Sequence, residues 1–140
     1  MSNFYRYSKE NMDGLELPAP ESLFGTLQTA VANAAIFVAH MAKYGHKSTV
    51  RELIGAGTRL EKLSMVATLS AAFYVGAVIG SIAIATGRTL SGGTSIADVL
   101  LSARQQNLSR PWLRASLQRW PGIYSEVPGR RAHRLAATRR

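Results

Sequence analysis

The chain has 140 residues, a net charge of +9 at pH 7 and no cysteine. This length is enough for one domain of ordinary size. The lack of cysteine excludes disulfide bonds and thiolate metal sites, but it leaves the cellular compartment open. A basic surplus of this size is compatible with binding to nucleic acid, with binding to an anionic membrane surface, or simply with solubility of the chain.

Charged residues alternate with two long uncharged segments, residues 22–42 and 63–86. Residues 1–21 carry a net charge of −2 and residues 43–62 one of +3. Residues 87–140 carry +8, and all ten of their basic residues are Arg. The alternation predicts four regions in chain order: a polar N-terminal segment (1–21), a hydrophobic helical hairpin (22–87), an amphipathic helical region (88–125) and a disordered basic tail (126–140).

The first 21 residues are polar and lack the basic and then apolar order of a cleaved secretory signal. Pro18 and Pro20 favour an extended backbone before the first uncharged segment. A helix is predicted from about residue 22 to residue 43, where Gly45 is placed to end it. No alternation of apolar and polar residues is sustained along the chain, so the expected fold class is all-α.

The polar residues of this first predicted helix fall within one narrow stripe when they are placed at about 100° per residue. Amide and imidazole groups are costly against lipid, so a helix in a membrane would turn this stripe toward protein or water. The stripe is therefore a candidate pore lining. The alternative is the polar edge of a surface helix in a soluble bundle. The candidate residues are Thr26, Thr29, Asn33 and His40.

A second long helix is predicted from about residue 59 to residue 86. Thr58 with Glu61 has the spacing of a capping box at its start, and Gly87 stands where a C-terminal cap belongs. Thr49 with Glu52 forms a similar pattern in the basic loop before it. No helix is expected to run through the loop, because Gly residues separate the two boxes.

The uncharged part of the second helix, residues 63–86, is long enough to cross a hydrocarbon core of about 30 Å. Small residues line one of its sides and would let another helix backbone approach closely. This pattern predicts a helix-packing face that joins several copies into a homo-oligomer. The alternative is an Ala-rich helix buried in a soluble core. The face consists of Ala72, Gly76, Gly80 and Ala83.

Two short amphipathic helices are predicted after residue 94. Ser95, with Asp98 three residues later, can cap the first, and Ser109 can cap the second. The second predicted helix carries aromatic and Arg side chains, which are typical of a membrane interface with anionic lipid. The interface group is Trp112, Arg114 and Trp120.

No other motif indicates chemistry or a nucleic-acid partner. The Arg residues could contact phosphate, but no nucleic-acid-binding motif accompanies them. His40 and His46 are six residues apart, which places them off one helix face, and no carboxylate joins them. There is no nucleophile–base pair, paired acidic motif or phosphate loop. We therefore expect no enzymatic activity, no metal site and no cofactor.

If both uncharged segments span a membrane, the basic loop between them should face the cytoplasmic side. A hairpin that arrives from outside would be pulled inward by the membrane potential, at about 2.3 kcal/mol per charge per 100 mV. In architecture the chain resembles the small pore-forming toxins that bacteria export into rival cells through type VI secretion. The resemblance rests on the two uncharged segments, the basic loop and the Gly76/Gly80 pattern.

This resemblance implies a pore-forming antibacterial toxin that depolarises the inner membrane of a target cell. It also implies a delivery apparatus and an immunity protein in the producer. A phage holin is an alternative, but its usual topology would place the basic loop outside, against the charge rule. A third alternative is a non-enzymatic subunit or assembly factor of a membrane complex, whose Gly76/Gly80 face would pack on a helix of the partner.

Overall fold

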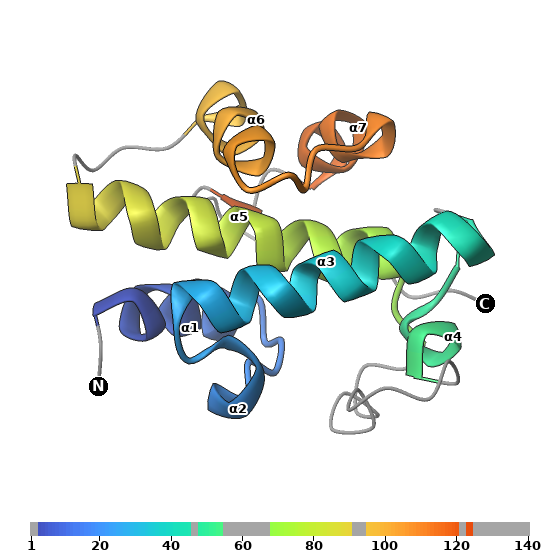
Figure 1. The fold of residues 1–140 in the computed structure, drawn as a ribbon, viewed down its shortest axis with the longest axis horizontal. Helices are drawn as coiled ribbons and strands as arrows, with labels where there is room; N and C mark the ends of the chain where they lie inside the picture. The colour runs from blue at the N-terminus through green and yellow to red at the C-terminus, as the bar shows by residue number, and fades with distance from the viewer. Residues whose placement is uncertain (1–2, 46–47, 55–67, 91–94, 121–122, 125–140) are drawn as a thin grey trace.

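A computed structural model describes residues 3–45, 48–54, 68–90, 95–120 and 123–124 (Figure 1). Over these residues the chain is all-α, as the sequence predicts. An isolated β-bridge pairs Thr49 with Ser70. The helices are α1 (Asn3–Gly14), α2 (Glu21–Phe24), α3 (Leu27–Tyr44), α4 (Val50–Ile54), α5 (Ala71–Leu90), α6 (Ile96–Gln105) and α7 (Pro111–Arg119).

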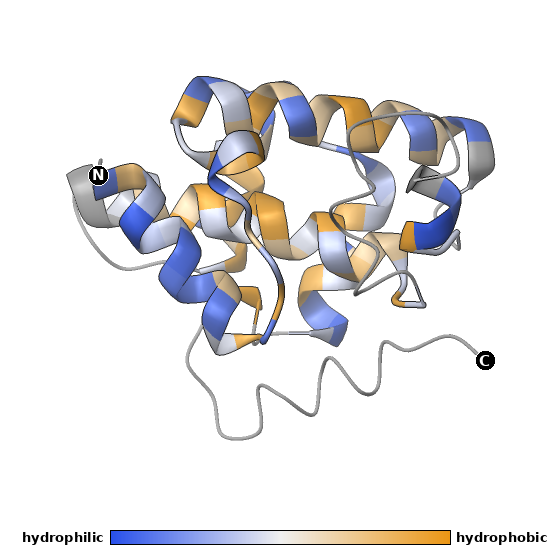
Figure 2. Cartoon of the chain, turned by 90° about the horizontal axis from the view of Figure 1, so that it is seen from below, coloured by the Kyte–Doolittle hydropathy of each residue, from blue (hydrophilic) through white to orange (hydrophobic). Residues whose placement is uncertain are grey.

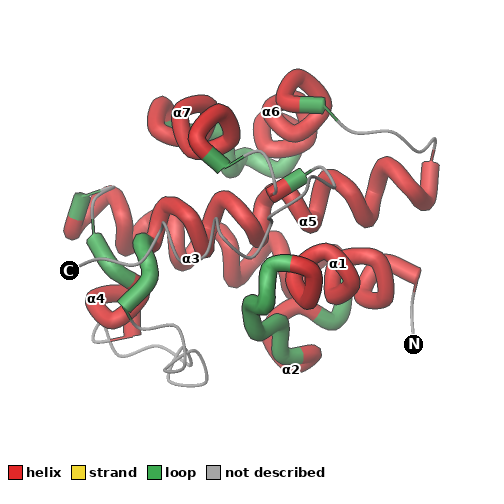
Figure 3. The backbone as a smooth tube through the Cα atoms, turned by 180° about the vertical axis from the view of Figure 1, so that it is seen from behind, coloured by secondary structure: helices red, strands yellow, loops and turns green. Residues whose placement is uncertain are grey.

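Helix α5 is the centre of the bundle. Every residue from 71 to 85 is buried, and none of them carries a charge that burial would leave unpaired. Helices α1, α3, α6 and α7 all pack against it. In Figure 1, α3 lies in front of α5, with α6 and α7 on one side of this pair and α1 and α2 on the other. Figure 3 shows the same two sides from behind.

A line of aromatic rings joins α2, α3 and α5. The ring of Phe37 meets Phe24 and Tyr74 edge to face, with centroids 6.2 and 6.3 Å apart. Such pairs add about 0.5–1.5 kcal/mol beyond the area that they bury. The Tyr74 hydroxyl donates to the Pro18 carbonyl oxygen at 2.9 Å, which ties the segment before α2 to α5.

Helix α1 was missed by the sequence analysis, which treated residues 1–21 as a polar segment. Tyr5, Ser8 and Met12 recur at three- and four-residue intervals and are buried. This spacing was a readable signal of an amphipathic helix, although the segment is polar on average. On its exposed face, the Lys9 ammonium pairs with the Asp13 carboxylate at 2.8 Å.

The helix predicted from residue 22 to residue 43 is divided in two. Thr26 has an extended backbone, and its hydroxyl oxygen accepts a hydrogen bond from the Thr29 amide, so it is the N-cap of α3. Gly25 separates this cap from α2, and Gly45 has a positive φ of 93° just after α3. The predicted end of the helix at Gly45 is confirmed, whereas its continuity across Gly25 and Thr26 is wrong.

The long helix predicted over residues 59–86 begins later than expected. The Val50 amide donates to the Leu69 carbonyl, and the Ala71 amide donates to the Ser48 carbonyl, each at 2.9 Å. The backbone just before α5 therefore pairs with the segment entering α4, and the helix begins at Ala71. It also continues past Gly87, which is not its C-terminal cap. The capping box at Thr58 lies outside the described residues, and the full hairpin stays a prediction.

Within the part of the chain that the structure describes, no helix combines the length and the apolar character needed to cross a membrane. The expected transmembrane helices, the ion channel and the insertion into a target inner membrane are therefore wrong. The physical reason is that each uncharged segment is interrupted. The first is broken at Gly25 and Thr26, and the second is not helical at residues 68–70.

The two short C-terminal helices are confirmed, with one change at a cap. The Ser95 hydroxyl accepts from the Asp98 amide at 3.3 Å, and the Asp98 carboxylate accepts from the Ser95 amide at 3.1 Å, which completes a capping box for α6. Helix α7 has Arg110 as its N-cap and Pro111 as its first residue, so Ser109 is not the cap. The predicted disordered tail, residues 126–140, lies outside the described residues.

Burial of Tyr74 predicts a loss of stability at alkaline pH. Burial raises the pKa of Tyr74 above its ordinary value of 10.0. Below pH 10 the phenol is neutral in both the folded and the unfolded chain. Above pH 10 the unfolded chain loses this proton and the folded chain keeps it. The free energy of unfolding should then fall by up to about 1.4 kcal/mol per pH unit.

The measurement is urea unfolding between pH 8 and pH 11.5. Tyr74→Phe should be less stable at pH 8, because it lacks the hydrogen bond to Pro18, but it should lose less stability as the pH rises. Tyr7→Phe removes one phenol hydroxyl from a half-exposed position of α1 and is the control. Equal pH slopes in Tyr74→Phe and the wild type would contradict the assignment.

Candidate functional site

A buried polar cluster joins α1 and residue 123 to α5. The Asn11 side-chain amide donates to the Ser81 hydroxyl at 2.9 Å and to the Ile123 carbonyl oxygen at 2.6 Å. Asn11 and Ser81 are 8% and 0% exposed. A buried polar group without such partners costs about 1–3 kcal/mol, so this cluster fixes where residue 123 crosses α5. Its role in the fold is structural.

The predicted helix-packing face of α5 is occupied from within the same chain. A Cβ added at Gly80 would lie 2.4 Å from Cγ2 of Ile123 and 3.1 Å from its backbone oxygen. At Gly76 the nearest atoms would be Cδ1 of Ile123 at 3.3 Å and Cβ of Ser116 at 3.8 Å. Ala72 and Ala83 of the same face are also buried. The two glycines therefore admit α7 and Ile123 to the surface of α5.

The four candidate pore-lining residues lie along α3 and its start, and three of them bond locally. The Thr26 hydroxyl donates to the Thr29 hydroxyl at 2.9 Å. The Asn33 side-chain amide donates to the Leu23 carbonyl at 2.8 Å and to the Thr29 carbonyl at 3.1 Å. The bond to Leu23 joins α3 to α2, and the other two lie within α3 and its N-cap. This is a structural role for the polar stripe.

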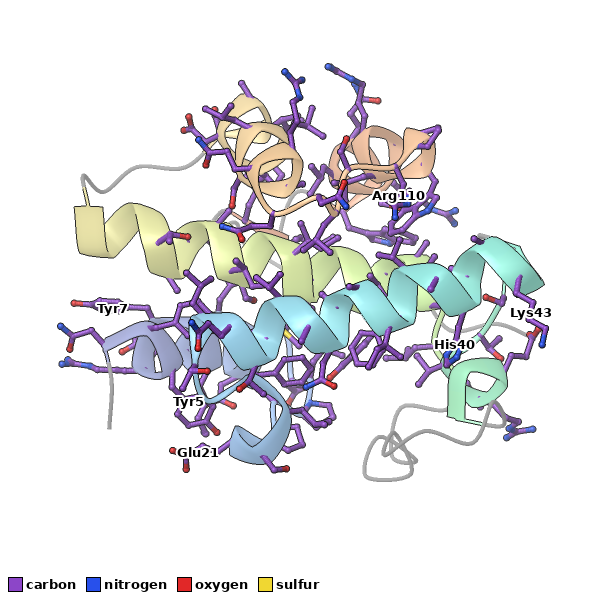
Figure 4. All side chains as sticks on the ribbon, in the orientation of Figure 1. Tyr5, Tyr7, Glu21, His40, Lys43 and Arg110 are labelled. Atoms are coloured by element: carbon purple, nitrogen blue, oxygen red, sulfur yellow. The ribbon has the colours of Figure 1, made fainter. Side chains whose placement is uncertain are left out.

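His40 lies near the end of α3, beside α4 (Figure 4). Its Nδ1 atom is buried and has no hydrogen-bond partner among the residues that the structure describes. The Ser48 hydroxyl oxygen, just before α4, is in the same situation. Within the described ranges no group of three or more His, Cys, Asp or Glu side chains could hold a metal ion.

The predicted membrane-interface group is divided between the core and the surface. Trp120 is 5% exposed, and its ring packs edge to face on Phe73 with centroids 5.1 Å apart. Trp112 is half-buried against the core, whereas Arg114 is exposed. The Arg119 guanidinium lies 4.8 Å from the centre of the Trp120 ring. The exposed residues of α7 are Pro111, Arg114, Ala115, Gln118 and Arg119.

An exposed uncharged surface runs along the outer side of α3. We call it the α3 face, and it was not identified from the sequence. Helix α3 follows the outer edge of the bundle (Figure 2), and Ile36 on this surface is 42% exposed. The signal that could have revealed it is the run of alanines between the polar stripe residues. The α3 face consists of Ala32, Ala35, Ile36, Ala39 and Ala42, all exposed.

Charges of opposite sign lie on the two sides of α3. The acidic side, on α1, α2 and the segment between them, has Glu10, Asp13, Glu16 and Glu21 with Arg6 and Lys9, a net −2. The basic side, on α6, α7 and the turn between them, has Arg104, Arg110, Arg114 and Arg119 with Asp98, a net +3. Figure 4 labels one residue of each, Glu21 and Arg110, on opposite sides of α3.

Comparison with known proteins gives no match for this chain. The chain matches no protein-family model, no curated protein sequence and no solved structure. The interpretation of its surfaces therefore rests on their own geometry and chemistry.

The two glycines of α5 should respond differently to substitution by alanine. Alanine is favoured over glycine in a helix by up to about 1 kcal/mol. Gly76→Ala should be close to neutral, because only the flexible end of Ile123 must move. Gly80→Ala should lower the free energy of unfolding by about 1–3 kcal/mol, since the new Cβ overlaps Ile123 close to its backbone.

Urea unfolding at pH 7 measures both variants against the wild type. Gly76→Ala is the matched control, one helical turn earlier on the same buried surface. A Gly80→Ala variant at least as stable as Gly76→Ala would show that Ile123 does not lie against Gly80.

Proposed function

We propose that this protein is a non-enzymatic interaction module whose α3 face binds an α-helix of a partner. The observation that carries the proposal is the α3 face itself. It presents Ile36 and four alanines to solvent along a helix without a charged residue between Leu27 and Ala42. A helix that lies on the outside of a soluble bundle usually turns charged and polar residues outward. Here Asn33 of the polar stripe bonds to Leu23 of α2, and the small apolar residues are exposed.

Alanine side chains suit this surface to helix binding. Interaxial distances between packed helices are about 8–10 Å, depending on the side chains at the contact. Alanines permit the short end of this range, where backbone and Cβ atoms of the two helices meet directly. Ile36 is the one large side chain on the α3 face, and burial of its 42% exposed surface would add up to about 1 kcal/mol.

The proposal refines the third interpretation of the sequence, a non-enzymatic subunit or assembly factor. That interpretation assigned partner binding to Gly76 and Gly80, but Ile123 and α7 occupy this surface. Partner binding is therefore reassigned to α3. The toxin and holin hypotheses stay predictions of the sequence pattern, and no described contact tests them.

Site-specific photo-crosslinking tests the proposal. A benzophenone amino acid at position 36, in the full chain expressed in the cells that make it, should give a cross-linked product of defined mass. The matched control is the same amino acid at position 101 of α6. Leu101 is 51% exposed and is the other large apolar side chain at the described surface. It should give little or no product.

A second substitution separates binding from misfolding. Ala39→Glu, added to the position-36 probe, places a charge on the α3 face one turn away and should abolish the product. The circular dichroism spectrum and melting temperature should stay unchanged, because Ala39 is exposed. The proposal would be refuted by the absence of a product at position 36, by equal products at positions 36 and 101, or by a product that survives Ala39→Glu.

A further inference from the structure

The α3 face has the spacing of a two-helix seam. Its four alanines follow one another at intervals of three, four and three residues. Gln28, also exposed, extends the series by four residues toward the start of α3. This is the alternation of a heptad repeat, in which the first and fourth positions face a partner helix. Ile36 and Val31 then flank the seam on its two edges.

The charge distribution indicates which helix fits this seam. Because α3 lies between the acidic and the basic side (Figure 1), a partner lying along α3 meets both. A partner with a basic surface beside one edge of its helix and an acidic surface beside the other would match both sides at once. This chain is itself such a molecule, since its own α3 has these two sides.

The direction of the partner follows from symmetry. A two-fold axis parallel to α3 keeps the two α3 helices parallel and brings the basic side of each copy to the acidic side of the other. A two-fold axis across α3, in the plane of the contact, would make the helices antiparallel. It would place like charges together on both sides. Like-charge contacts across an interface are unfavourable and act against the wrong arrangement.

We infer that the partner helix is α3 of a second copy of this chain, packed in parallel along the α3 face. This inference rests on the proposed function. The seam supplies close packing, and the acidic and basic sides select the parallel direction. The same self-complementary surface on both copies gives a closed, isologous dimer.

The lack of cysteine makes the arrangement directly measurable, because each introduced thiol is unique. Ala32→Cys and Ala42→Cys are placed near opposite ends of the seam, about 15 Å apart at 1.5 Å per residue. A disulfide needs Cα atoms about 4.4–6.8 Å apart. In a parallel dimer each residue meets its own copy, so each single variant should oxidise to a disulfide-linked dimer.

The control is Ala97→Cys, an exposed alanine of α6. In the parallel dimer the two copies of residue 97 lie on opposite sides of the contact, so this variant should not form a cross-linked dimer. Native mass spectrometry of the unmodified full chain should show twice the chain mass. The dimer fraction should fall as the salt concentration rises, because the two sides attract through screened charges.

Other outcomes would overturn the inference. Disulfides only in a mixture of Ala32→Cys with Ala42→Cys would show antiparallel helices. Equal cross-linking of Ala97→Cys would show contact without a defined surface. A monomer at all concentrations, with no disulfide, would exclude the second copy. In that case, a photo-crosslink at position 36 to a protein of another mass would leave the proposed function standing, and no photo-crosslink would refute both.

Discussion

The complete burial of α5 is the constraint on which the rest of the structure depends. Fifteen successive residues, 71–85, are buried, so the helix must be covered on every side. Helices α1, α3, α6 and α7 provide this cover. The gap left between them is closed by Ile123, which is possible only because Gly76 and Gly80 have no side chain. Asn11 then holds the Ile123 backbone in place from α1.

This constraint also explains why the sequence resembled that of a membrane protein. A helix surrounded by other helices and a helix surrounded by lipid both lack charge, and both use small residues where backbones approach. In this chain the neighbours of α5 are segments of the same molecule. In the first uncharged segment, Asn33 and Thr26 form hydrogen bonds around the start of α3, whereas the α3 face is exposed.

The features that could be predicted from the sequence are local ones. The Ser95–Asp98 capping box and the end of α3 at Gly45 each depend on residues a few positions apart. The contacts that could not be predicted join distant segments. Tyr74 bonds to Pro18 across 56 positions, and Asn11 bonds to Ile123 across 112. Helix α1 could have been found from the spacing of its buried residues, but its polar average concealed it.

The candidate site shows the same division between local features, which could be predicted, and contacts between distant segments, which could not. The sequence identified the polar stripe of α3 and the small-residue face of α5, and in the structure both make contacts within the chain that the sequence did not indicate. The surface proposed to bind another molecule is the α3 face, which lies beside the half-buried residues Thr29, Asn33 and His40 of the polar stripe. Its value for binding depends on a rigid support. Phe37 supplies this support from the opposite side of α3, where it is buried in the core.

Hydrogen exchange of the full chain in aqueous buffer tests the central claim most directly. If α5 is the buried centre of the bundle, its amides between residues 75 and 85 should be the slowest to exchange. Their exchange should require global unfolding, and Gly80→Ala should accelerate it. Exchange of these amides as fast as those of α4, at the edge of the bundle, would contradict the account.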